Sequence, residues 1–161
     1  MKKQIFYSFH FDIDVMRVQQ IRNIGVIEGN TPVTVNEWED IKRQGKTAIE
    51  SWIESNMKFK SCVVVLVGAE TARRPWVKHE IQKAWELRKG IVGIYIHNIR
   101  CPRNGISIKG RNPFEQFTVN GTKLSDIVKC YDPSTTNAYG WISSYLEAAV
   151  DEAVSIRGRY K

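Results

Sequence analysis

The sequence predicts an α/β fold in which one doubly wound, mainly parallel sheet carries helices on both faces. Apolar, strand-like runs alternate along the chain with segments of helical periodicity, which is typical of this class. The runs at 62–67 (CVVVLV) and 91–96 (IVGIYI) contain no alternating polar residues, so both faces of these strands should be covered. With 161 residues, no internal repeat and no linker, the chain is expected to form a single domain over 1–161.

In the first half of the chain, the apolar pattern predicts strands over 4–9 and 31–35 and helices over 15–23 and 46–57. Asp12 or Asp14 can cap the first of these helices. Pro32 suits a strand at the edge of the sheet. The helix over 46–57 is expected because its apolar residues recur at helical spacing.

In the second half, Pro75 suits the first turn of a helix that runs to about Lys89 and that Gly90 would stop. A last short strand is expected over 127–131 and a closing amphipathic helix over 138–156. Residues 98–121 lie between the strand at 91–96 and the strand expected over 127–131. They are rich in Gly, Pro, Asn and Arg, which predicts a long irregular excursion. Its length makes it a candidate for function.

The composition is that of an ordinary folded protein, with 42% apolar and 25% charged residues. The 24 Lys and Arg against 17 Asp and Glu give a net charge of +7, which favours anionic partners such as phosphorylated small molecules, nucleic acid or a membrane surface. Because the basic residues are spread without a basic run, a solvated surface is favoured over nucleic-acid binding. The three cysteines lack CxxC spacing and read as reduced thiols. No apolar run is long enough to span a membrane, and we expect a cytoplasmic protein.

Several motifs of known enzyme chemistries are incomplete in this sequence. The run Gly45-Lys46-Thr47 ends like a Walker A loop, but position 40 is Asp where that loop needs its first glycine. No GxGxxG follows any predicted strand, which argues against a Rossmann dinucleotide site. His79-Glu80 lacks the second histidine of HExxH, because position 83 is Lys. We therefore expect no metal site.

The location of a ligand site follows from the predicted fold. In doubly wound sheets, ligands bind outside the carboxyl ends of the strands, where the winding reverses. If the strand order is flavodoxin-like, this reversal lies between the first strand and the strand at 62–67. The site would then be formed by residues 8–14 on one side and 68–80 on the other.

Glu80 is the most informative residue of the helix that begins at Pro75. It falls inside the apolar arc of that helix, which consists of Val77, Ile81, Ala84, Trp85 and Leu87. A carboxylate in this position should face the sheet or a cleft beside it, where desolvation raises its pKa. The alternatives are that Glu80 pairs with a buried Arg or Lys, or that it reaches solvent at the edge of the helix.

Several strings of the sequence match one known family. They are FYSFHFDID, RVQQIRN, NEWED, GKTAIESWI, VVVLVGAETARRPWVKHEIQKAW, GIVGIYI and RNPFEQF. In these strings the chain resembles the TIR-like family represented by ThsB of Thoeris antiphage defence systems, over roughly residues 1–120. The TIR fold is a flavodoxin-like sheet, so the resemblance agrees with the architecture expected from the pattern.

The resemblance implies that the chain processes NAD⁺. TIR enzymes break the bond between nicotinamide and ribose with a glutamate placed four residues after a tryptophan, and Trp76 and Glu80 have this spacing. Glu80 is therefore expected to be the catalytic residue. The positions of the matching strings imply a substrate-binding set of Ser8, Phe9, His10, Asp14, Trp38 and Trp76.

ThsB-like proteins are thought to close the ADP-ribosyl product on itself, which gives a cyclic ADP-ribose isomer. The family implies that this diffusible product activates a ThsA-type effector, that a phage component triggers the enzyme, and that a homo-oligomer is possible. NAD⁺ is then the substrate, and no cofactor is implied. A second hypothesis is a non-catalytic TIR-like adaptor that acts through protein assembly, in which Glu80 would be structural. A third, minor hypothesis is a basic module that binds nucleotides or nucleic acid.

Overall fold

Within the residues that the structure describes, the sheet has five strands, all parallel, in the order β2-β1-β3-β4-β7. The computed structural model describes residues 4–24, 28–29, 40–102, 105–134 and 136–160. The strands are β1 (Gln4–Ser8), β2 (Glu28–Gly29), β3 (Cys62–Val67), β4 (Gly90–Tyr95) and β7 (Cys130–Tyr131). Because β1 has β2 on one side and β3 on the other, the winding reverses at β1, and the flavodoxin-like order expected from the sequence is confirmed.

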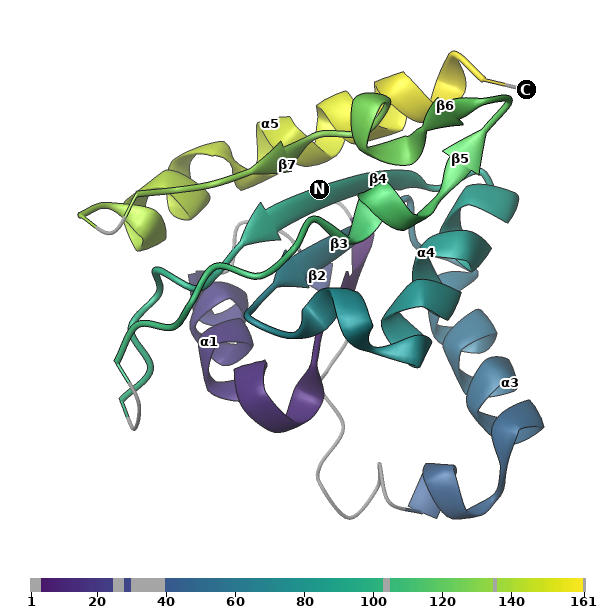
Figure 1. The fold of residues 1–161 in the computed structure, drawn as a ribbon, viewed down its shortest axis with the longest axis horizontal. Helices are drawn as coiled ribbons and strands as arrows, with labels where there is room; N and C mark the ends of the chain where they lie inside the picture. Colours follow the sequence, from purple (N-terminus) through teal and green to yellow (C-terminus); the bar gives the residue numbers. More distant parts are fainter. Residues whose placement is uncertain (1–3, 25–27, 30–39, 103–104, 135, 161) are drawn as a thin grey trace.

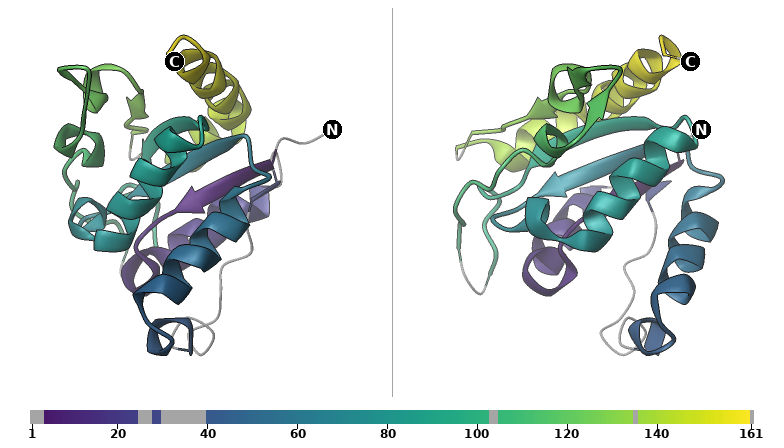
Figure 2. Two further views of the ribbon diagram at one scale, coloured as in Figure 1. Left: turned by 90° about the vertical axis from the view of Figure 1, so that its right-hand side faces the viewer. Right: turned by 45° about the vertical axis from the view of Figure 1, so that its right-hand side comes forward.

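Helices cover both faces of this sheet, as Figures 1 and 2 show. They are α1 (Phe11–Ile24), α3 (Lys46–Met57), α4 (Pro75–Glu86) and α5 (Ala138–Gly158). Apolar residues of α1 and α5 pack with Ile5 and Tyr7 of β1, whereas those of α3 and α4 pack with Phe6. Side chains alternate between the two faces of a strand, so β1 contributes to both layers of the core.

The two central strands are the most deeply buried part of the molecule. Every residue of β3 and of β4 is buried. The prediction that these apolar runs are covered on both faces is therefore confirmed. The helix α3 also has the bounds expected from the sequence, with Ile49, Ile53 and Met57 on its buried side.

The first helix begins earlier than the sequence pattern predicts. It starts at Phe11, separated from the end of β1 by two residues, so Asp12 and Asp14 lie inside its first turn and do not cap it. The carbonyl oxygen of His10 accepts the backbone N–H of Asp14 at 2.9 Å, which closes that first turn. The capping prediction is therefore wrong, because the helix begins four residues before the position that the apolar pattern predicts.

The end of α4 also differs from the expectation. The helix ends at Glu86, and Gly90 is the first residue of β4. A side chain at Gly90 would place its Cβ 2.7 Å from the backbone nitrogen of Val154 in α5. Gly90 is therefore a point of close contact between β4 and α5 and does not stop the preceding helix.

The segment between β4 and α5 is irregular for most of its length. It contains the short 3₁₀ helices η2 (Pro113–Gln116) and η3 (Leu124–Asp126) and the hairpin of β5 (Thr118–Val119) and β6 (Thr122–Lys123). The strand expected over 127–131 is reduced to the two residues of β7. The strand expected over 31–35 lies outside the described residues. No helix in the described part of the chain is long and apolar enough to span a membrane.

Candidate functional site

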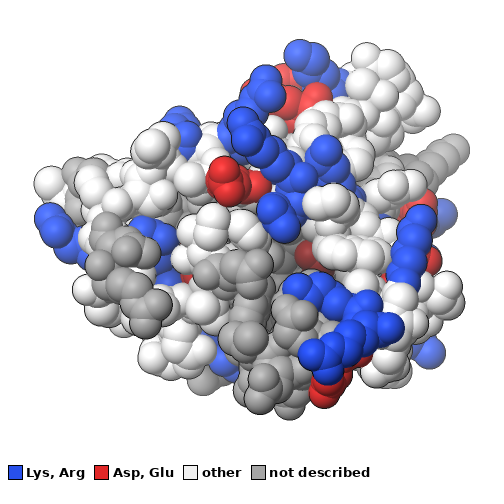
Figure 3. Space-filling view, turned by 60° about the horizontal axis from the view of Figure 1, so that its bottom comes forward, with Lys and Arg blue, Asp and Glu red and all other residues white. Residues whose placement is uncertain are grey.

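The candidate site lies where β1 and β3 end, at the carboxyl edge of the sheet. Ser8 is the last residue of β1 and lies opposite Val65 of β3, while β3 itself ends at Val67. The short 3₁₀ helix η1 (Thr71–Arg73) and then α4 follow β3. Figure 3 shows the face of the molecule that includes this edge. The predicted position of the site, between residues 8–14 and 68–80, thus corresponds to one continuous region of the fold.

A hydrogen bond joins β1 to α4 across this edge. The hydroxyl of Ser8 donates to Oε1 of Glu80 at 2.8 Å. Ser8 is fully buried and Glu80 is 8% exposed. The apolar residues Val77 and Ile81 press α4 onto the sheet, and this packing brings the carboxyl group of Glu80 to the end of β1. Of the predicted site residues, Ser8 and Glu80 are thus in direct contact.

The surroundings of Glu80 favour its protonated form. Burial raises the pKa of the Glu80 carboxyl group to about 8, and the hydrogen bond from Ser8 lowers it in part. Within the described residues, no Lys or Arg forms an ion pair with Glu80. The arrangement is therefore a buried acid whose proton is exchangeable near neutral pH, which suits acid–base and electrostatic catalysis.

Asp14 supplies a second buried carboxylate at this edge. It is fully buried, and its Oδ1 accepts a hydrogen bond from Nη1 of Arg17 at 3.3 Å. Burial raises the pKa of Asp14 to about 6, and the charge of Arg17 opposes this rise. Its other oxygen, Oδ2, is buried without a hydrogen-bond partner and occupies the space that a side chain at Gly68 would fill. Asp14 thus lies against the turn that follows β3.

Arg17 is a residue of this region that the sequence reasoning missed. Its side chain is 2% exposed, and its guanidinium group donates from Nε to the carbonyl of Ile99 and from Nη2 to that of Gly105, both at 2.9 Å. It therefore fixes the start of the 98–121 excursion to α1. The spacing of three residues from Asp14 is a possible signal of an ion pair, but it carries no information on burial.

The excursion returns across the turn after β3. Gly110 lies so close that a side chain there would collide with the carbonyl oxygen of Gly68. Further along, Nε2 of Gln116 donates to the carbonyl of Ala72 in η1 at 2.9 Å. The segment 105–116 thus forms one wall beside the candidate site.

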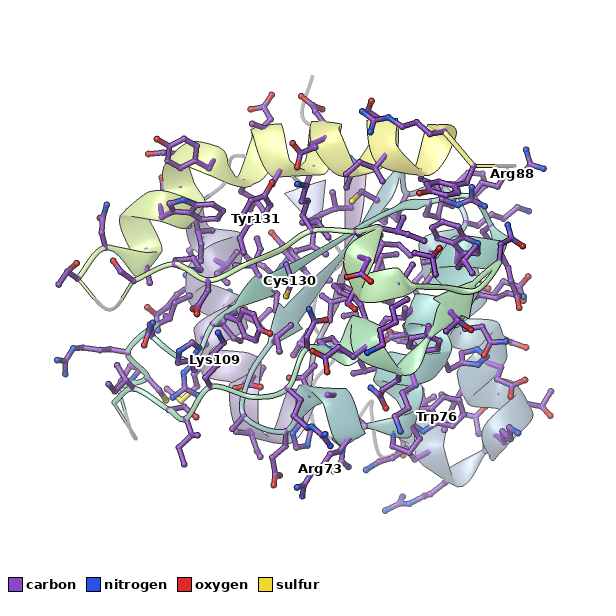
Figure 4. The ribbon with its side chains drawn as sticks, turned by 45° about the horizontal axis from the view of Figure 1, so that its top comes forward. Arg73, Trp76, Arg88, Lys109, Cys130 and Tyr131 are labelled. Carbon is purple, nitrogen blue, oxygen red and sulfur yellow. The ribbon has the colours of Figure 1, made fainter. Side chains whose placement is uncertain are left out.

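A polar cluster holds the same segment to the end of β7. Nζ of Lys109 lies 2.8 Å from Oδ2 of Asp132 and 4.6 Å from the ring centre of Tyr95. Nε2 of His97 lies 3.9 Å from Oδ1 of Asp132. Burial lowers the pKa of His97, which favours its neutral form. Lys109 and Cys130, the first residue of β7, are labelled in Figure 4.

The remaining predicted site residues have different surroundings. Phe9 is partly buried and packs against the core cluster of α1 and α5, the face opposite to α4. His10 is 7% exposed in the turn between β1 and α1. Trp76, labelled in Figure 4, is half-buried one turn before Glu80, with its ring centre 5.7 Å from that of His79. Trp38 lies outside the described residues. The structure thus gathers Ser8, Glu80 and Asp14 at the edge and turns Phe9 to the other layer.

The strand order and the buried acid at the reversal point define this chain as a flavodoxin-like α/β domain with its candidate site at the carboxyl edge. A sequence model of the family described as Thoeris protein ThsB, TIR-like domain, matches residues 6–100. The chain is also 33% identical over 133 residues to the Bacillus cereus (strain MSX-D12) protein named "Putative cyclic ADP-D-ribose synthase ThsB1". The aligned region covers 77% of this chain and 69% of that protein. The chain therefore belongs to the TIR-like ThsB family of Thoeris proteins.

Proposed function

We propose that this chain is an NAD⁺-processing enzyme that breaks the nicotinamide–ribose bond and closes the ADP-ribosyl group into a cyclic ADP-ribose isomer. The observation that carries the proposal is the buried acid Glu80, held by Ser8 at the ligand-binding edge of the sheet. The name of the Bacillus cereus relative, "Putative cyclic ADP-D-ribose synthase ThsB1", supports the same reaction.

The chemistry of bond cleavage suits such a carboxyl group. When the bond from ribose C1′ to the nicotinamide nitrogen breaks, the electron pair leaves with nicotinamide, and C1′ becomes an oxocarbenium-like cation. The carboxylate of Glu80 can stabilise this cation, and the low dielectric of a buried position strengthens the interaction. The positive nicotinamide ring of the bound substrate lowers the pKa of Glu80 and so favours the ionised form.

Ring closure requires a hydroxyl of the same ADP-ribosyl group to attack C1′ before water does. The new C–O bond forms as that hydroxyl loses its proton, which the Glu80 carboxylate can accept. If water attacks, the product is ADP-ribose. Positioning and exclusion of water thus decide the product. The wall formed by 105–116, which lies against the turn after β3, suits the second task.

The other predicted residues complete this proposal. Trp76 and Trp38 are proposed to stack on the rings of the substrate, and His10 to shape the site at the end of β1. Phe9 packs into the opposite layer and is given no contact with the substrate. The product is proposed to act as a diffusible signal for a ThsA-type effector in the cytoplasm. A phage component would start the reaction, and a homo-oligomer would complete the site. NAD⁺ is the substrate in this scheme, and no cofactor takes part.

The test compares the purified protein with its Glu80→Gln variant. Each is incubated with NAD⁺, with and without lysate from infected cells, and nicotinamide and the nucleotide products are followed by chromatography. We expect release of nicotinamide and a cyclic product from the wild type and loss of both in Glu80→Gln, with the fold retained by circular dichroism. Glu86→Gln is the matched control, because Glu86 is exposed on the same helix. Unchanged turnover in Glu80→Gln would remove this residue from the mechanism.

A non-catalytic adaptor is the second candidate function. The observation that favours it is the exposure of two large side chains on α5, Tyr139 at 50% and Tyr145 at 54%. Such residues are frequent in protein interfaces. An adaptor would release no nicotinamide under any of the conditions above, and replacement of both tyrosines by Ser would abolish its assembly in light-scattering measurements.

A further inference from the structure

We propose that four basic side chains, Arg73, Arg74, Lys78 and Arg111, bind the pyrophosphate group of the dinucleotide substrate. This inference rests on the proposed function, since it assigns a subsite of the same reaction. It starts from the net charge of +7, which requires more basic side chains than the acids of the chain can pair.

None of these four side chains has a partner within the described part of the chain. Several other basic residues do: Arg43 pairs with Asp40, Lys46 with Glu50, Lys83 with Glu54 and Lys109 with Asp132. Glu70, three residues before Arg73, and Glu115, four residues after Arg111, are exposed and form no ion pair with the four. The buried acid Glu80, two residues after Lys78, forms none either. Like charges without counter-charges repel one another, and a bound dianion would relieve this repulsion.

The fold brings the four charges to the same region from two segments. Arg73 and Arg74 are exposed at the start of α4, and Lys78 lies one turn further on. Arg111 follows Gly110, which lies against the Gly68–Ala69 backbone, and the bond from Gln116 to Ala72 holds the same segment beside η1. Figure 3 shows Lys and Arg side chains gathered across the middle of this face.

The position of these charges relative to Glu80 fits the substrate. A helix rises ~1.5 Å per residue, so Arg74 lies about 9 Å from Glu80 along the axis of α4. In NAD⁺ the pyrophosphate is joined to the 5′ oxygen of the ribose whose C1′ carries nicotinamide. One ribose therefore separates the bond that breaks from the pyrophosphate dianion. A substrate lying along α4 would present the C1′–N bond to Glu80 and the pyrophosphate to the basic residues.

The charge on the pyrophosphate does not change when the C1′–N bond breaks. An interaction with it is thus as strong in the ground state as in the transition state. Loss of this interaction should raise KM and leave kcat unchanged, whereas loss of Glu80 should lower kcat. This difference separates the inference from the proposed function.

The experiment uses the full chain with two variants, Arg73→Gln/Arg74→Gln and Arg111→Gln. Arg88→Gln is the matched control, because Arg88 is exposed at the far end of α4 from Arg73, as Figure 4 shows. Binding of ADP-ribose and of adenosine is measured by calorimetry at low and high salt, and KM and kcat are measured with NAD⁺. We expect both variants to bind ADP-ribose about three- to tenfold more weakly and to show a matching rise in KM. Adenosine binding and kcat should stay at the wild-type values.

Equal ADP-ribose affinity and equal KM in the variants and the wild type would overturn the inference. So would an equal loss in Arg88→Gln, because the effect would then be one of overall charge. If the wild type releases no nicotinamide, the proposed function fails, and ADP-ribose binding still decides whether the basic residues hold a pyrophosphate. Absence of ADP-ribose binding together with an unaltered KM would reject the subsite outright.

Discussion

Glu80 is a buried acid whose proton can be exchanged near neutral pH, because burial raises its pKa to about 8 and Ser8 supplies its hydrogen bond. Sequence periodicity placed this side chain on the apolar arc of its helix. Its partner could not be inferred from periodicity, since 72 residues separate Ser8 from Glu80 along the chain. The contact arises only when β1 lies beside β3 and α4 packs on both.

The pH dependence of the reaction should report this acid. If the carboxylate is the active form, kcat/KM for NAD⁺ rises with pH with a midpoint of about 8, the value for the free protein. Ser8→Ala removes the hydrogen bond that lowers the pKa of Glu80, so its midpoint should move to higher pH. Ser144→Ala, an exposed serine of α5, is the control and should keep the wild-type profile. A midpoint that moves to lower pH in Ser8→Ala would contradict this explanation.

The same pKa shift predicts how the stability of the protein depends on pH. The ordinary pKa of a glutamate side chain is 4.5, so between about pH 4.5 and pH 8 Glu80 holds a proton in the folded protein that it has lost in the unfolded chain. The contribution of this group to stability is therefore largest at low pH and decreases as pH rises through that interval. Urea denaturation should show Glu80→Gln gaining free energy of unfolding relative to the wild type from pH 5 to pH 9. The exposed variant Glu147→Gln should show no such trend.

At the scale of elements, α1 and the 98–121 excursion are joined by Arg17. Removal of one partner from a buried ion pair leaves an uncompensated charge, so Arg17→Met should lower the free energy of unfolding by about 3–5 kcal/mol. Urea denaturation measures this change. The double variant Arg17→Met/Asp14→Asn should be less unstable than the sum of its single variants.

The chain offers a matched control for this pair. Arg43 and Asp40 have the same i,i+3 spacing, but their side chains are 77% and 69% exposed, against 2% and 1% for Arg17 and Asp14. Arg43→Met should therefore change the free energy of unfolding by no more than about 1 kcal/mol. Similar losses in the two variants would mean that burial does not determine the importance of Arg17.

The elements that the sequence predicts well are those with local signals. The spacing of apolar residues gives the bounds of α3, and the unbroken apolar run gives β3. Features that depend on distant contacts were predicted poorly. The local pattern places Gly90 at the end of a helix. Its actual role, a close contact with α5, involves residues more than 60 positions away, which a local pattern cannot show. The wall of 105–116 could not be predicted for the same reason, as its position depends on Arg17 and Gly68.

At the scale of the whole molecule, the family match and the folding unit differ in extent. The match covers 6–100, but α5 lies beyond it and buries Ile142, Leu146 and Val150 against the sheet. A chain that ends at residue 134 would leave one face of β3 and β4 exposed to water. We expect this truncated chain to show no cooperative unfolding by circular dichroism, whereas a chain that ends at residue 160 unfolds like the wild type. Cooperative unfolding of the shorter chain would show that α5 is dispensable.

The pleat of β1 has a consequence for how the length of this strand can change. Ser8 faces α4, while the next residue, Phe9, packs into the opposite layer of the core. Loss or gain of one codon in this strand would reverse the sides to which its residues point. The aromatic ring of Phe9 would then face Glu80, and the hydroxyl of Ser8 would lie in the apolar core between the sheet and the helices α1 and α5. Evolution of this gene can therefore substitute residues of β1 as long as each keeps its side of the sheet, but it cannot insert or delete a residue in the strand.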